Sequence, residues 1–300
     1  MPGETLALTL LASAKLMTDV GIVWLVGVSV FRGLALGAGR RGDLGLERRL
    51  VRQAGLALGL LFMASAGRLY AQTYSSFGLD EPVTAALLRL VAEQTRWGER
   101  WIWQSAAVVA AAPVVAIAVI GVSWAWWLVA IATVGIVVTS PMTGHALSYS
   151  DGAFWPMTLQ IVHLAAAGAW LGTLLVLVTE GLRPVISTGT DVVGLVARFS
   201  GVALVAAGAV GLTGVLTAWF YVDHLPQLWQ TAYGRVLLVK TGLFGLTALT
   251  GAYNWKVVRP ALGAPAGVAR LRRSGAAELA VAVVLLAVTA WLVHLPMPHE

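Results

Sequence analysis

Residues 140–172 read SPMTGHALSYSDGAFWPMTLQIVHLAAAGAWLG and join two long apolar runs. Four potential metal ligands gather at this junction, in a chain without cysteine: Met142, His145, Met157 and His163. Thioether and imidazole groups suit copper, because methionine favours Cu(I) and histidine accepts either oxidation state. We therefore interpret the junction as the extracytoplasmic mouth of a membrane protein and as a candidate copper site.

The composition predicts that lipid surrounds much of the protein. Hydrophobic residues make up 58% of the 300 residues and charged residues only 11%, whereas a soluble domain carries about 25% charged residues. The pI near 10.1 reflects arginine in cytoplasmic loops rather than a nucleic-acid partner. The lack of cysteine excludes disulfides and thiolate sites. Because residues 1–11 contain no basic residue, we expect no cleavable signal peptide.

Eight apolar runs are long enough to cross a bilayer, which takes about 20 residues. The sequence therefore predicts an all-α polytopic membrane protein with about eight transmembrane helices, at roughly 5–37, 50–73, 99–121, 123–141, 155–179, 197–220, 234–256 and 275–295. Abundant glycine and alanine in these runs predict closely packed helices and a compact bundle. Segment 84–94 is too short to span and is predicted to be an amphipathic helix on the outer surface.

The loop charges predict the orientation of the chain. Arginine and lysine collect in the loops 38–52, 180–198 and 256–274, whereas the loops 142–154 and 221–233 contain neither. Because cytoplasmic loops carry the excess of positive charge, we expect both termini to be extracytoplasmic and the protein to lie in the cytoplasmic (inner) membrane.

The two halves of the sequence resemble each other weakly but in a constant order. The matching pairs are 51–58 with 197–204, Trp24 with Trp170, 95–98 with 231–234, and 141–145 with 296–299. Four spans per half give both halves the same orientation. The sequence therefore predicts two parallel four-helix pseudo-repeats, 1–145 and 146–300, related by an axis along the membrane normal.

The second Pro-Met motif adds candidate ligands at the C-terminal end: His294, Met297 and His299. Like the first motif, it falls where a predicted span leaves the membrane on the outer side. The alternative is a methionine that faces lipid and a histidine at the interface. His163 lies inside the fifth predicted span, where ionisable groups indicate function. A neutral histidine that only hydrogen-bonds a neighbouring helix is the alternative there.

The repeat pairs His163 with Met17, and Asp19 lies nearby. Both residues are further candidate ligands. Asp19 and Lys15 are four residues apart, so an ion pair within one helix is the structural interpretation. The functional interpretation is that Asp19 carries a proton or attracts a cation. Snorkelling to the headgroups accounts for Arg68, Arg235 and Lys240.

An ordered set of residues supports a family resemblance. The set contains GHA at 144–146, His163 with Trp170 and Gly172, RFS at 198–200, TAYGR at 231–235, Lys240, and residues 254–260. It resembles the copper-resistance protein D (CopD) family. The resemblance implies inward copper transport, His145 and His163 as copper-associated positions, and a small periplasmic copper-binding partner (CopC). The sequence holds no CopC-like β domain.

Three functions stay open at this point. The first is a copper transporter, and the second is a non-transporting module that delivers or senses copper. The third is a redox protein with one haem or a quinone. With only His163 clearly inside a predicted span, we expect no haem. The sequence contains no P-loop, HExxH or GxSxG motif, so we do not expect an enzyme.

Overall fold

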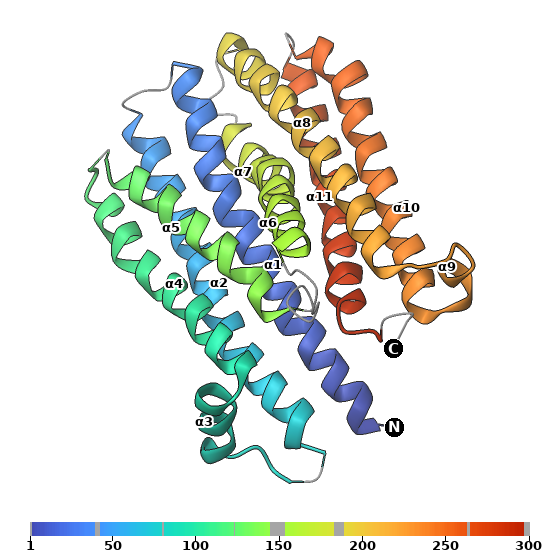
Figure 1. The fold of residues 1–300 in the computed structure, drawn as a ribbon. Coiled ribbons are helices and arrows are strands. Elements are labelled where there is room, and N and C mark those ends of the chain that lie inside the picture. Colours follow the sequence, from blue (N-terminus) through green and yellow to red (C-terminus); the bar gives the residue numbers. More distant parts are fainter. Residues whose placement is uncertain are drawn as a thin grey trace.

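Every element in the described part of the chain is helical. The structure is a computed structural model that describes residues 2–39, 43–79, 81–122, 124–144, 154–182, 189–262 and 265–296. The α-helices are α1 (Pro2–Gly37), α2 (Leu44–Phe77), α3 (Ala85–Gln94), α4 (Arg96–Val119), α5 (Ala125–Thr139), α6 (Phe154–Ala167), α7 (Thr173–Val176), α8 (Gly189–Tyr221), α9 (Gln227–Gln230), α10 (Ala232–Tyr253) and α11 (Pro265–Leu292) (Figure 1). A 3-10 turn, Ser140–Thr143, follows α5, and another, Arg259–Ala261, closes the seventh span.

The predicted set of eight spans is confirmed by length and composition. The sixth and eighth spans begin earlier than predicted, at Val192 and Ala266. In the eighth span the reason is that arginine is a good helix former, so the helix continues through Arg270, Arg272 and Arg273, which lower the local hydropathy. Short α3 precedes the third span, as expected for segment 84–94.

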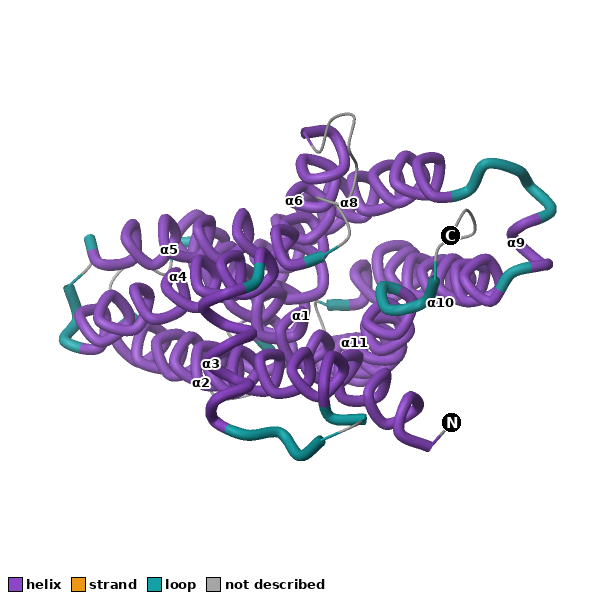
Figure 2. Tube along the Cα trace, turned by 60° about the horizontal axis from the view of Figure 1, so that its bottom comes forward, coloured by secondary structure: helices purple, strands orange, loops and turns teal. Residues whose placement is uncertain are grey.

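Helix α1 occupies the centre of the bundle (Figures 1 and 2). It packs against α2 and α5 on one side and against α6, α7 and α11 on the other. The approach is closest at Gly27, where an added Cβ would overlap the backbone of Gly172. A Cβ on Gly172 would in turn overlap the carbonyl of Val23. Only glycine permits this contact, which confirms the expected close packing around α1.

Helices α8 and α10 leave broad apolar faces exposed, unlike α1. In the most apolar 18-residue stretch of each helix, 17% of the residues are buried in α8 and 6% in α10, against 50% in α1. Such faces suit contact with lipid chains. The start of α1 and the end of α11 lie at one end of the bundle, together with α3 and α9 (Figure 1). That this end is extracytoplasmic stays a prediction from the loop charges.

The third and seventh spans start with the same local structure. Thr95 Oγ1 accepts a hydrogen bond from Gly98 N at 2.9 Å, and Thr231 Oγ1 accepts one from Gly234 N at 2.9 Å. At each glycine an added Cβ would overlap the backbone of the short helix before it. These are aligned positions of the predicted repeat. The repeat as a whole, and the division at residue 145, stay predictions.

Candidate functional site

His163 is held by a hydrogen bond to the neighbouring helix α8. Its Nδ1 lies 2.9 Å from Thr213 Oγ1, and Thr213 Oγ1 donates to the carbonyl of Ala209 at 2.6 Å. Since the hydroxyl hydrogen is used in that second bond, Thr213 accepts from His163, and Nδ1 carries the hydrogen. In this tautomer Nε2 carries the lone pair of the ring. The bond thus fits both the structural and the ligand interpretation of His163.

The two methionines of the junction, Met142 and Met157, lie near the start of α6. Met157 is in the first turn of α6 and is half-buried. Met142, also half-buried, lies in the 3-10 turn Ser140–Thr143, which packs against α6. His145 lies outside the described residues, so the structure leaves its place in the junction open.

Asp19 forms the ion pair with Lys15 that the sequence predicted. Asp19 is 4% exposed, and it also interacts electrostatically with Arg68 of α2 and Lys240 of α10. His163 interacts electrostatically with the same Lys240. The bundle therefore collects ionisable groups from four different spans in one region.

Arg68 points into the bundle, so the expectation that it snorkels to the headgroups was wrong. It is 9% exposed, and its Nη1 donates to Gln104 Oε1 at 2.7 Å. The guanidinium also stacks over Trp97 and reaches the carbonyl of Thr143 at 3.5 Å. Arg68 thereby ties α2 to α4 and to the turn that carries Met142, because a planar guanidinium can donate in several directions.

The C-terminal candidates are only partly described. His294 lies just after α11, and its Nδ1 donates to the carbonyl of Ala290 at 2.8 Å. Met297 and His299 lie outside the described residues. Met17 is half-buried on α1. Among the described residues, no three His, Asp or Glu side chains come together.

The sequence interpretation missed two buried carboxylates, the first of which is Glu180. It was placed in a loop, but it is 1% exposed in the π-helical stretch Leu177–Gly181. Gln53 Nε2 donates to its Oε1 at 2.7 Å, and Arg49 Nε lies 3.2 Å from its Oε2. Trp24 donates to the same Gln53 at 2.8 Å. Glu180 therefore links the fifth span to α1 and α2.

The second missed carboxylate is Glu278 of α11, which is 3% exposed. Trp170 Nε1 donates to its Oε1 at 3.2 Å, and Asn254 Nδ2 donates to its Oε2 at 3.0 Å. Trp170 and Asn254 lie in the π-helical stretches Gly168–Gly172 and Asn254–Val258. A single glutamate inside a predicted span was the signal for this site, since such residues indicate function.

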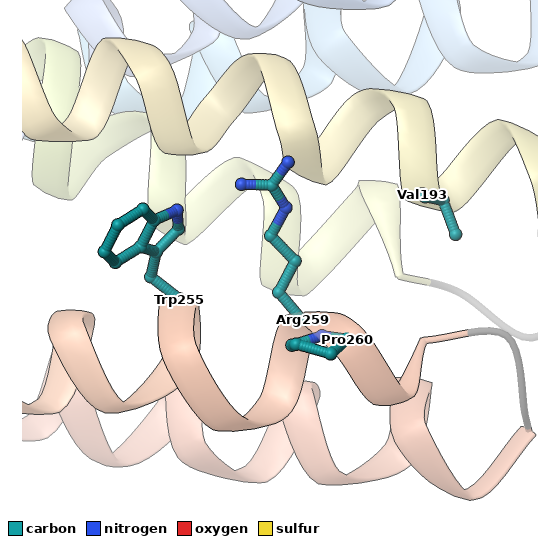
Figure 3. A pocket seen from close by; sticks show the side chains of 4 residues that line it. All are labelled: Val193, Trp255, Arg259 and Pro260. Atoms are coloured by element: carbon teal, nitrogen blue, oxygen red, sulfur yellow. The ribbon is translucent and has the colours of Figure 1, made fainter.

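A groove of about 470 Å³ opens beyond Asn254, lined by Val193, Trp255, Arg259 and Pro260. The guanidinium of Arg259 extends across it toward α8 (Figure 3). The groove lies between the first turns of α8 and the end of the seventh span. It therefore lies at the opposite end of α8 and of the seventh span from α9 (Figure 1).

Comparison with known proteins gives two family matches. Residues 5–155 match the profile described as "Copper resistance protein D-like, N-terminal domain", and residues 193–292 match "Copper resistance protein D". Copper resistance protein D of Pseudomonas syringae pv. tomato is 31% identical over 293 residues, covering 92% of this chain and 93% of that protein. The chain belongs to the copper resistance protein D family. This confirms the resemblance seen in the sequence.

A second relative of the chain is copper transport protein CutJ of Bacillus subtilis (strain 168). It is 30% identical over 170 residues, which cover 55% of this chain and 30% of CutJ. The aligned part is thus under a third of that longer protein. No solved structure gives a significant match. His163, Trp170 and Glu180 lie between the two matched segments.

Proposed function

We propose that this multi-pass membrane protein binds copper at the outer end of the bundle and carries it inward across the cytoplasmic membrane. The fixed imidazole of His163 carries this proposal. With Nδ1–H bonded to Thr213, Nε2 is the coordinating atom, and such oriented imidazoles are good metal ligands. The family and the printed names of its relatives, copper resistance and copper transport, support copper as the cargo.

The proposed capture site combines His163 with soft ligands of the same region. Met142, His145 and Met157 would take the ion first, and Met17 and Asp19 would approach from α1. His294, Met297 and His299 would form the equivalent site at the end of α11. A small periplasmic copper-binding protein of the CopC type would deliver the ion. Glu278 and the Arg259 groove extend the polar groups past His163 toward the opposite end.

Copper uptake into proteoliposomes tests the transport function. We expect uptake by the wild-type protein, its loss in His163→Ala and in the His145→Ala/His163→Ala double variant, and its retention in His224→Ala. His224 is the matched control because it is exposed in the loop before α9. Equal uptake by His163→Ala and the wild type would contradict the proposed site.

A non-transporting module that holds copper for delivery or sensing is the alternative. Stoichiometric copper binding by the wild-type protein without any uptake would favour it. An absorbance spectrum of the purified protein separates both functions from a haem redox protein, because bound haem would give a Soret band.

A further inference from the structure

Three carboxylates inside the described spans are almost fully buried, and they differ in what neutralises them. Asp19 pairs with Lys15, and Glu180 has Arg49 within 3.2 Å. Glu278 forms no ion pair with any lysine, arginine or histidine in the ranges that the structure describes. Since an unpaired ionised carboxylate is costly to bury, a proton or another cation at Glu278 would lower that cost.

Glu278 lies far from both ends of its helix. The span runs from Ala266 to Leu292, so about 18 Å of helix lies before Glu278 and about 21 Å after it, at 1.5 Å per residue. Water at the helix ends therefore cannot solvate this carboxylate directly, and the neighbouring side chains determine its charge state.

The hydrogen bonds around Glu278 fit the ionised carboxylate. The Trp170 indole can only donate, and Asn254 presents its amide nitrogen. Ser274 holds that orientation, because its Oγ donates to Asn254 Oδ1 at 2.5 Å. The ionised form thus has hydrogen bonds but no counter-charge, and the protonated form lacks an acceptor in this arrangement.

Asn254 and Ser274 can supply that acceptor without any backbone movement. Half a turn of the Asn254 amide presents Oδ1 to a Glu278 O–H and Nδ2–H to Ser274 Oγ. Ser274 then accepts from Asn254 and turns its single hydroxyl hydrogen to the carbonyl of Arg270, which is 3.1 Å away. Every polar atom of the three side chains stays bonded in both states.

The other charged groups on the elements around α11 are occupied or remote. On α1, Glu4 is exposed, Lys15 pairs with Asp19, and Arg32 pairs with Glu47; Glu180 has its arginine partner. Arg259 extends into its groove, and five further basic residues are exposed: Lys256, Arg235, Arg270, Arg272 and Arg273. Lys240 precedes Asn254 by about 21 Å of helix. None of these groups competes with a cation at Glu278.

We propose that Glu278 is a membrane-embedded proton-exchange site, with Asn254 and Ser274 as its hydrogen-bond switch. A proton from water bonds to a carboxylate oxygen of Glu278, the Asn254 amide rotates, and loss of the proton reverses both steps. The cation is a proton rather than copper, because the bonded partners offer neither thioether nor imidazole. If the chain transports copper as proposed above, this exchange couples that transport to the proton gradient; the proton site itself does not rest on transport.

Infrared difference spectroscopy of the purified full chain, between alkaline and acidic buffers, tests the proton site. We expect a protonated-carboxyl C=O band at acidic pH that shifts in D2O and is lost in Glu278→Gln. Glutamine keeps the size of the side chain and an oxygen that accepts from Trp170, so this variant should fold. Glu180→Gln is the matched control and should keep the band, because Arg49 lies 3.2 Å from Glu180 and already supplies its counter-charge.

A band that persists unchanged in Glu278→Gln would overturn the proton site. Copper binding at Glu278 would also overturn it. That result would appear in equilibrium dialysis as one copper ion fewer bound by Glu278→Gln than by the wild type.

Copper uptake with and without an imposed pH gradient tests the coupling. We expect the gradient to change wild-type uptake but not Glu278→Gln uptake. Equal gradient dependence in both would overturn the coupling. No wild-type uptake would overturn the transport function and the coupling together, while the infrared titration would still decide the proton site.

Discussion

Trp170 donates its indole hydrogen to Glu278 across the interface between the fifth and eighth spans, at 3.2 Å. The same indole packs edge-on against Phe244 of α10, with ring centroids 6.0 Å apart. One side chain therefore joins three spans at the level of the buried carboxylate. This tryptophan aligns with Trp24 in the predicted repeat, and Trp24 likewise donates to a buried polar side chain, Gln53.

Replacing Trp170 by phenylalanine should destabilise the protein. The aromatic contact with Phe244 can persist, but Glu278 Oε1 loses a donor, and an unsatisfied buried polar group costs about 1–3 kcal/mol. We expect a lower melting temperature in detergent, measured by circular dichroism. Trp255→Phe, at an exposed position beside the groove, should leave it unchanged. Equal melting temperatures of Trp170→Phe and the wild type would contradict the importance of this bond.

Asn254→Leu should shift the infrared band of protonated Glu278 to higher frequency. Leucine removes the acceptor that the carboxyl O–H is expected to use, and a carboxyl group with fewer hydrogen bonds has a stiffer C=O bond. Thr241→Val, on an exposed face of the same helix, should leave the band in place. A band unmoved by Asn254→Leu would mean that Asn254 is no part of the switch.

Thr213→Val should weaken copper binding at His163 without removing the imidazole. Loss of a bond that orients a ligating histidine typically lowers metal affinity about 10–100-fold. Equilibrium dialysis of the purified protein measures the change. The comparison variant is Thr241→Val, whose hydroxyl bonds only within its own helix. Unchanged affinity in Thr213→Val would argue that His163 binds copper in another orientation or not at all.

Gly172→Ala should disrupt the packing of the fifth span on α1. The new methyl group would overlap the carbonyl of Val23, and overpacking of this kind costs about 1–3 kcal/mol or more. We expect less monodisperse protein in size-exclusion chromatography and a lower melting temperature. Gly201→Ala is the matched control, because nothing lies within 4 Å of the added methyl on α8. Similar behaviour of both variants would contradict the close approach.

Arg68→Met should also lower the melting temperature. It removes the bond to Gln104 and one positive neighbour of Asp19, and hydrogen bonds to charged groups contribute about 1.5–3 kcal/mol. Arg89→Met, on the exposed face of α3, should have no effect. An Arg68→Met protein as stable as the wild type would contradict a stabilising role for the bond between Arg68 and Gln104.

The apolar runs by themselves determined the eight spans. Crossing a bilayer takes a continuous apolar stretch of about 20 residues, and each such stretch can be recognised in the sequence without knowledge of its neighbours. The ordered residues around His163 and along 198–260 were likewise sufficient for the family. The Lys15–Asp19 pair could be predicted because both residues lie on one helix, one turn apart.

Only the tertiary structure decided which polar side chains meet. Gln53 and Glu180 are 127 residues apart, and Trp170 and Glu278 are 108 apart. Their contacts depend on how each helix is rotated about its axis, and in lipid a span that is apolar on all sides gives little sign of that rotation. Packing fixes it instead: Gly27 meets Gly172, and Glu180, Trp170 and Asn254 lie in π-helical stretches, which shift the facing side chains.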